Sequence, residues 1–261
     1  MAKILHQLPL IREWVRRAKI GELPGFLGPG AYAIDKYYQH LKRRLARIRR
    51  ELSLLRARRE LERNKRRALG FPHIAITGYA NAGKTTLFNK LTDERKPVGP
   101  EMFTTLSPKA KRANINGLSA IVVDTVGFVR NIPAEIVEAF YATLEEVSSS
   151  DIALLVLDSS EDVNVVLSKL RSSLNTLIRI GYVGKPLVIA LNKIDLCSDE
   201  GRQIENAVRK LVPELYPWKW SVVRISALKE INLNVLKEVV VNFIKKEDSL
   251  RIENRAQAGE R

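Results

Sequence analysis

The feature that most restricts the fold of this chain is a glycine-rich loop between an apolar strand and a helix. The loop reads Gly-Tyr-Ala-Asn-Ala-Gly-Lys-Thr and runs from Gly78 to Thr85. A short apolar run at 73–77 precedes it, and the helical pattern of 84–92 follows it. Glycines at both ends let backbone amides curl around a phosphate, where the helix N-terminus adds partial positive charge. The loop therefore predicts an α/β fold that binds a phosphate-bearing ligand.

The chain beyond this loop alternates strand and helix patterns. Asn116-Gly117, a strong two-residue hairpin signal, joins two expected strands. The expected strands after the first are 109–115, 119–124, 152–158, 186–192 and 221–226, and the further helices are 133–147, 163–180, 200–212 and 233–245. Such alternation with a single hairpin predicts a mostly parallel sheet with helices on both faces.

The first 70 residues show a different period. Apolar residues recur in steps of four and three, the spacing of a coiled-coil seam. They are Ile34, Tyr38, Leu41, Leu45, Ile48, Leu52 and Leu55, and the shorter run before them is Leu8, Ile11, Val15 and Ala18. Segment 31–69 contains neither Gly nor Pro, which allows one helix of about 38 residues. The glycines and prolines of 21–30 permit a reversal, so an antiparallel α-helical hairpin is expected.

Gly70-Phe71-Pro72 breaks this helix, and the chain is expected to have three parts. These are a basic helical hairpin at 1–70, an α/β domain at 71–246 and a polar, flexible tail at 247–261.

Positive charge is concentrated in the hairpin. Residues 1–73 hold 19 Lys and Arg against 6 Asp and Glu, a net +13 of the chain's +15. The arginines mainly off the seam are Arg43, Arg44, Arg47, Arg50, Arg58, Arg59, Arg66 and Arg67. Such a field favours a polyanion, either RNA or an anionic membrane, and a helix charged only for solubility is the alternative. The charge density favours RNA.

Composition indicates a cytoplasmic protein without stable membrane insertion. The single cysteine, Cys197, fits a reducing compartment. The longest purely apolar run, 152–157, is far shorter than the ~20 residues of a membrane helix, and the N-terminus lacks the features of a signal peptide. A monomer is expected, although the short first arm leaves part of the seam at 41–55 uncovered.

The glycine loop fits a nucleotide with Mg²⁺. Lys84 is expected to reach the β- and γ-phosphates, and the Thr85 hydroxyl to ligate Mg²⁺. The other residues expected to surround the phosphates are Gly78, Tyr79, Ala80, Asn81, Ala82, Gly83 and Thr86. Asp124-Thr125-Val126-Gly127 ends the next buried strand, 40 residues after Lys84. There the Asp124 carboxylate can hold Mg²⁺ through water and the Gly127 amide can sense the γ-phosphate; alone, these residues would indicate only a turn.

A threonine between these two motifs is expected to act as the first switch. Thr105 is favoured, with Thr104 as the alternative, in a loop rich in proline and glycine. Its hydroxyl would close on Mg²⁺ when the γ-phosphate is present. A threonine that only stabilises a β-turn is the other interpretation.

Two further motifs fit a guanine base. Asp195, in the run Asn-Lys-Ile-Asp that begins at Asn192, can accept hydrogen bonds from the guanine N1–H and exocyclic amine. A base without those donors would leave the carboxylate unsatisfied. Asn192 would brace the loop and Lys193 would pack its stem along the base. Ser226-Ala227 ends the last strand, where a backbone amide can donate to the guanine O6. In order, the four motifs predict a Ras-like P-loop GTPase domain that binds GTP or GDP.

The motifs closely resemble those of the HflX-type GTPases, a family of the translation-factor-related class. The similar runs are 78–89, 103–108 and 124–130, together with the arginine-rich helix, and the resemblance covers roughly 24–246. It implies a protein that hydrolyses GTP and binds the large ribosomal subunit, through rRNA contacts of the hairpin, to split ribosomes or aid their assembly. In the family the equivalent of Thr105 is typically the only threonine of its run, which supports Thr105 over Thr104.

The sequence departs from the family pattern at its N-terminus. Family members begin with an α/β subdomain, whereas here only part of the helical hairpin remains. Gly28-Pro29-Gly30-Ala31-Tyr32 stands where the family usually has Gly-Pro-Gly-Glu-Thr. The chain is therefore interpreted as a shortened variant or as one whose start lies too late.

Hydrolysis is expected to depend on Lys84, Thr105 and Gly127 and to be slow without help. Phe128 stands where Ras-like proteins carry the glutamine that orients the attacking water. A partner or a monovalent cation would supply what is missing, and we hypothesise that Asn81 helps to bind K⁺ beside the phosphates. An asparagine tolerated in a tight loop is the alternative.

Two other functions compete with a ribosome-bound GTPase. One is an RNA-remodelling enzyme, for which the sequence offers no second catalytic constellation. The other is a non-hydrolysing scaffold that binds rRNA and uses GTP as a structural ligand. Asp158 and Arg130 lie where a catalytic role is conceivable, but a strand-end carboxylate and a surface arginine are the favoured interpretations.

Overall fold

A computed structural model describes residues 9–13, 16, 29–68, 70–93, 109–125, 127–128, 144–197 and 200–259 of the 261-residue chain. The chain divides into two compact units, and the boundary in sequence falls between Ala68 and Leu69. This boundary lies beside Gly70, where the sequence predicts that the long helix ends.

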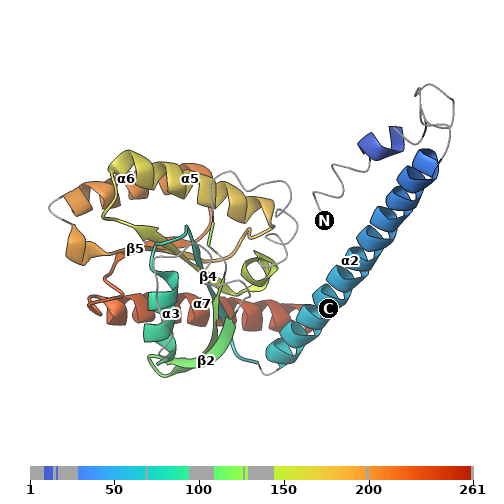
Figure 1. Ribbon diagram of the computed structural model, residues 1–261. Helices are drawn as coiled ribbons and strands as arrows, with labels where there is room; N and C mark the ends of the chain where they lie inside the picture. Colours follow the sequence, from blue (N-terminus) through green and yellow to red (C-terminus); the bar gives the residue numbers. More distant parts are fainter. Residues whose placement is uncertain are drawn as a thin grey trace. The chain divides into compact units, whose positions relative to one another are not determined.

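The first unit is built on one long helix, α2 (Pro29–Ala68), of 40 residues (Figure 1). Leu41 and Leu45 of its apolar seam are only 4% and 7% exposed. Ile11, from the helical residues before α2, packs against them together with Ile48. This contact between two helical segments is the one that the hairpin prediction requires. The side chains of Leu52 and Leu55, the last two residues of the predicted seam, lie outside the described part of the chain.

The polar face of α2 carries exposed arginines, and those with described, exposed side chains are Arg43, Arg44, Arg47, Arg50 and Arg58. Arg47 pairs with Glu51 at 3.0 Å, but both side chains are more than half exposed. Ion pairs so exposed contribute little to stability. The arginines therefore add positive charge to the surface of the unit without holding it together.

The second unit contains a six-stranded sheet in the order β2-β3-β1-β4-β5-β6. Its strands are β1 (His73–Gly78), β2 (Lys109–Ile115), β3 (Leu118–Asp124), β4 (Ile152–Asp158), β5 (Leu187–Asn192) and β6 (Trp220–Arg224). The pair β2–β3 is antiparallel, and the other four pairs are parallel. Asn116 and Gly117 join β2 to β3 with positive φ angles of 48° and 87°, the conformation that such a short turn needs. The predicted mostly parallel sheet is confirmed.

Helices cover both faces of this sheet (Figure 1). α3 (Lys84–Thr92) and α7 (Leu233–Gly259) lie on one face, and α5 (Val163–Arg179) and α6 (Glu200–Leu215) lie on the other. Strand residues alternate between the two layers, so Ile76 and Leu154 pack with Phe88 of α3 and Leu236 of α7. Within the described residues, no helix is both long and apolar enough to cross a membrane.

Two helices are longer than the sequence pattern predicted. α6 continues to Leu215 with Pro213 in its last turn, where the missing N–H affects a single helical hydrogen bond. α7 continues to Gly259, although the chain after residue 246 was expected to form a tail without secondary structure. That segment contains no proline and includes several Glu, Arg and Ala residues, which favour helix. The apolar pattern, from which an end at residue 245 was expected, therefore does not mark the end of the helix.

The assignment of Leu154 to the core predicts a large loss of stability when its side chain is shortened. Leu154 is 0% exposed, so Leu154→Ala should lower the free energy of unfolding by about 3 kcal/mol. Urea denaturation followed by circular dichroism would measure the change. Val165→Ala, at a 36% exposed site on α5, is the control and should change stability by less than about 0.5 kcal/mol. Equal effects of the two substitutions would contradict the assignment.

Candidate functional site

Most of the residues predicted to bind nucleotide lie at one edge of the sheet, where parallel strands end. β1 ends at Gly78, β3 at Asp124 and β5 at Asn192, and β4 ends between β1 and β5 at Asp158. Ligands of open α/β sheets bind at this edge because the loops there are free to surround them. The edge is therefore the candidate site.

The loop between β1 and α3 depends on its two glycines. Gly78 and Gly83 have φ angles of 138° and 92°. A β-carbon would lie 2.2 Å from the Val156 carbonyl oxygen at Gly78, and 2.2 Å from Nδ2 of Asn192 at Gly83. Neither position has room for a side chain, so glycine is what allows the loop to lie against the ends of β4 and β5.

Lys84 is held inside this loop. Its side chain is 8% exposed, and Nζ donates a hydrogen bond of 2.7 Å to the carbonyl oxygen of Tyr79. Burial lowers the pKa of Lys84 to about 8, although the carboxylate of Asp124 acts in the opposite direction. A bound phosphate would supply the negative charge that favours the ammonium form.

Thr85 and Asp124 bring two oxygen ligands together beside the loop. Thr85 Oγ1 donates to Asp124 Oδ2 at 3.2 Å, and Asp124 is 1% exposed. A hydroxyl and a carboxylate are hard oxygen donors of the kind that Mg²⁺ takes, so the residues present fit this ion. Gly127 lies close by, since a β-carbon there would be 2.6 Å from Lys84 Nζ.

The backbone of Phe128 forms hydrogen bonds with the loop between β1 and α3, called the phosphate loop below (Gly78 to Thr85). Its N–H donates to the Gly78 carbonyl at 2.8 Å, and its carbonyl accepts from the Ala80 N–H at 3.1 Å. Its ring is 3% exposed and packs edge to face on Tyr79, with centroids 6.0 Å apart. A buried phenyl ring has no group that can orient a water molecule for attack on a phosphate.

Asn192 connects three of the loops at this edge through one side-chain amide. Nδ2 donates to the Ala82 carbonyl at 2.8 Å, and Oδ1 accepts from the Ala227 N–H at 2.9 Å. Asn192 is itself 3% exposed and ends β5. The amide therefore fixes the distance between the phosphate loop and the loop after β6.

Asp195 offers an unsatisfied acceptor next to this amide. It lies in a short 3-10 helix, η1 (Ile194–Leu196). Within the described part of the chain its Oδ1 is buried and has no hydrogen-bond partner. Leaving such an oxygen without a donor is costly, and the paired N–H groups of guanine would supply one. Lys193 precedes it with a positive φ of 66°, and its ammonium pairs with Asp158 Oδ2 at 2.6 Å.

The backbone amides of the Ser226-Ala227 segment form hydrogen bonds within the protein. The Ser226 N–H donates to the Ile231 carbonyl at 3.1 Å, and the Ala227 N–H donates to Asn192. Both amides complete the internal hydrogen bonding of the loop, and donation from one of them to a guanine O6 stays a prediction. The Ser226 hydroxyl also accepts from the Lys229 N–H at 3.0 Å, which closes the turn.

Two further predicted residues, Asn81 and Thr86, belong to the phosphate loop and to the helix after it. Asn81 is exposed at the tip of the phosphate loop with a φ of 63°, and Thr86 is half-buried in the first turn of α3. Thr105, its alternative Thr104 and Arg130 lie outside the described residues.

Asp158 and Ser159, which were not among the residues predicted to bind nucleotide, contact the loop from Asn192 to Cys197. Because this loop contains Asp195, it is called the base-binding loop below. Ser159 donates to the Asn192 carbonyl through both its N–H, at 2.9 Å, and its hydroxyl, at 2.6 Å. Asp158 pairs with Lys193. The available signal was a carboxylate and two serines at the end of a buried strand, but the partners of Ser159 and Asp158 in this loop lie 33 and 35 residues away in sequence.

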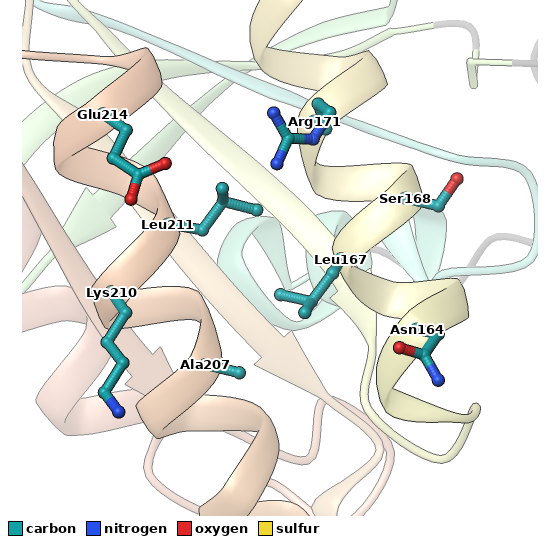
Figure 2. A pocket seen from close by; sticks show the side chains of 8 residues that line it. All are labelled: Asn164, Leu167, Ser168, Arg171, Ala207, Lys210, Leu211 and Glu214. Atoms are coloured by element: carbon teal, nitrogen blue, oxygen red, sulfur yellow. The ribbon is translucent and has the colours of Figure 1, made fainter.

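A groove of about 540 Å³ between α5 and α6 lies away from these loops (Figure 2). α5 lines it with Asn164, Leu167, Ser168 and Arg171, and α6 lines it with Ala207, Lys210, Leu211 and Glu214. None of the residues predicted to bind nucleotide contributes to it. The groove is a feature of the helical layer and not of the strand-end site.

The fold and the site define a protein of the P-loop GTPase class. Residues 73–193 match the family model described as 50S ribosome-binding GTPase, and residues 1–66 match the GTP-binding GTPase Middle Region. The chain is 53% identical over 230 residues to the GTPase HflX of Hyperthermus butylicus, covering 87% of this chain and 61% of that protein. With the GTPase HflX of Saccharolobus solfataricus the identity is 41% over 242 residues, covering 92% and 67%. The chain belongs to the HflX GTPase family.

A solved structure supports the same conclusion. A GTP-binding protein from Sulfolobus solfataricus, in complex with GDP, superposes with a TM-score of 0.63 at 32% sequence identity. The match covers 94% of this chain and 67% of that one. The chain thus spans about three fifths to two thirds of the length of these relatives.

The lowered pKa of Lys84 predicts that GDP binding weakens in mild alkali. The ammonium is present below pH 8 and is lost above it in the nucleotide-free protein, whereas bound phosphate raises the pKa. The Kd for GDP should therefore rise about tenfold between pH 7 and pH 9. Titration with a fluorescent GDP analogue would measure it.

Lys84→Arg is the control for this titration, because its guanidinium stays charged throughout the range. Its affinity for GDP, whatever its absolute value, should change less with pH than that of the unmodified protein. Equal pH dependence in both proteins would contradict the assignment to Lys84.

Proposed function

We propose that this protein hydrolyses GTP and binds the large ribosomal subunit in the cytoplasm, as a monomer, in ribosome recycling or biogenesis. The observation that carries the proposal is the convergence of three groups at one sheet edge. These are the enclosed ammonium of Lys84, the oxygen pair of Thr85 and Asp124, and the unsatisfied Oδ1 of Asp195. They match the phosphates, the metal ion and the base of GTP or GDP, respectively.

Each of these groups has a distinct task. Lys84 stabilises negative charge on the β- and γ-phosphates, and Thr85 and Asp124 hold Mg²⁺, which neutralises phosphate charge when bound. Thr105 closes as the first switch, and the Gly127 amide senses the γ-phosphate. The closeness of Gly127 to Lys84 supports its part in this scheme.

Hydrolysis without a partner is slow in this proposal. The position after Gly127 carries the buried ring of Phe128 instead of a side chain that can hydrogen-bond to water. Rate acceleration then requires a donor or a cation from outside the chain, as charge at a phosphoryl group must be stabilised where it develops. A partner or a cation therefore accelerates a turnover that is slow without it.

Two observations support a ribosomal partner: the match to the family model and the exposed arginines of α2. The family model for residues 73–193 names the 50S ribosome, and the exposed arginines of α2 offer phosphate contacts to rRNA. The net charge of +13 in residues 1–73 gives this contact a strong dependence on salt.

The proposal predicts that large ribosomal subunits stimulate GTP hydrolysis. Release of phosphate by the purified protein in K⁺ buffer should rise about tenfold or more when subunits are added, because the partner completes the site. A double variant, Arg43→Glu and Arg44→Glu, removes two exposed arginines of α2. It should keep the basal rate and lose most of the stimulation. Tight GTP binding without any stimulation would exclude this partner.

The K⁺ hypothesis for Asn81 predicts a dependence on the monovalent cation. Asn81 is exposed at the tip of the loop with φ of 63°, so its amide oxygen is accessible to an ion beside the phosphates. Basal turnover should be several-fold faster in K⁺ than in Na⁺ of equal ionic strength, and Asn81→Ala should remove the difference. Identical rates in the two buffers would refute the hypothesis.

A further inference from the structure

Asp158 is a buried carboxylate at the nucleotide edge to which the proposed function assigns no task. It ends β4 directly opposite Asn192 of β5 and is 7% exposed. Its Oδ1 accepts from the N–H of Ser160 at 3.1 Å and from the hydroxyl of Ser160 at 2.6 Å. Its Oδ2 accepts from Nζ of Lys193 at 2.6 Å. Both oxygens thus have donors, and the carboxylate faces the base-binding loop.

Lys193 is a residue whose conformation needs support from its surroundings. Its φ of 66° lies in the left-handed region, which residues with a β-carbon seldom adopt. Such conformations persist where neighbouring groups over-determine them, and they gather at binding sites. The side chain is also long and flexible, so a fixed direction requires a partner at its end.

The ion pair with Asp158 provides that partner. The side chains of Lys193 and Asp158 are 24% and 8% exposed, so water and salt screen the pair less than they screen a surface pair. The Asp158 oxygen is itself held in place by Ser160. The ammonium is therefore tied to the end of β4, and the four-carbon stem must run between that point and the backbone of the loop.

The neighbouring residues fix the same loop at its two ends. Ser159 donates twice to the Asn192 carbonyl, at the start of the loop. The Ser159 carbonyl accepts from the thiol of Cys197, at the end of the loop, at 2.9 Å. Segment 158–160 therefore holds the base-binding loop at its beginning, at Lys193 and at its end.

We infer that Asp158 is a positioning residue for nucleotide recognition: by holding the Lys193 ammonium it lays the lysine stem along the face of the bound guanine. Asp158 does not touch the nucleotide in this scheme and acts through Lys193 alone. The inference rests on the proposed function, because it requires the loop from Asn192 to Asp195 to bind the base.

Dissociation constants for GDP and for IDP, which lacks the exocyclic amine, would test the inference. Asp158→Asn keeps the shape of the side chain and removes its charge. It should raise the Kd for GDP about tenfold, or about 1.4 kcal/mol, and the Kd for IDP by the same factor. The factors match because contact with the ring face does not depend on the amine. Asp195→Asn, in contrast, should raise the Kd for GDP by a larger factor than the Kd for IDP.

A double-mutant cycle separates positioning from stability of the fold. Lys193→Met keeps an unbranched stem without the ammonium and should raise the Kd for GDP to a similar extent. In that background Asp158→Asn should add less than about a twofold change, because the partner through which it acts is gone. Glu205→Gln, which breaks an ion pair with Arg209 on α6, is the matched control and should leave both constants unchanged.

Three results would overturn the inference. One is an unchanged Kd in Asp158→Asn, and another is a loss for GDP that IDP does not share. The third is a loss that persists in full in the Lys193→Met background, which would assign Asp158 to stability of the fold. Failure of the unmodified protein to bind GDP would overturn the proposed function as well, so the two failures can be told apart.

Discussion

The site depends first on the side-chain amide of Asn192. It joins the phosphate loop, through Ala82, to the loop after β6, through Ala227, from the end of β5. Gly83 leaves the space that this amide occupies. Phosphate and base contacts must keep a set separation if they are to hold one nucleotide. A buried amide with both ends engaged sets that separation before any ligand arrives, because breaking either hydrogen bond would leave a buried polar group unsatisfied.

Around this amide, the protein carries several features that cost stability in the absence of ligand. Lys84 is buried with a pKa lowered by desolvation, Asp195 has a buried oxygen without a donor among the described residues, and Lys193 has a left-handed backbone. In the proposed function, phosphate would favour the charged form of Lys84, the guanine N–H groups would donate to Asp195, and the base would pack on the Lys193 stem. Such local costs concentrate at binding sites, and the well-packed sheet beneath them offsets the expense. Nucleotide binding and stability of this edge are therefore coupled.

Much of the fold and of the candidate site could be predicted from the sequence, because the signals for them are local. The strand, loop and helix around Gly78 and Lys84 and the hairpin at Asn116 follow from short patterns. Longer-range features could not be predicted. The pairing of Asp158 with Lys193 and the capture of the Ala227 amide by Asn192 depend on which strand ends become neighbours. The length of α7 was missed because its expected end was taken from the apolar pattern, whereas residues that favour helix continue α7 to Gly259.

The position of β2 at one end of the strand order also has a consequence for how the protein behaves in concentrated solution. An outer strand presents unpaired backbone groups to any other strand that approaches, which is a common route to aggregation. β2 displays Lys109, Lys111 and Arg112 as exposed side chains along this strand. A second copy that tried to extend the sheet would bring these cations against its own. Charge repulsion between these side chains thus opposes edge-to-edge pairing of the β2 strands of two chains.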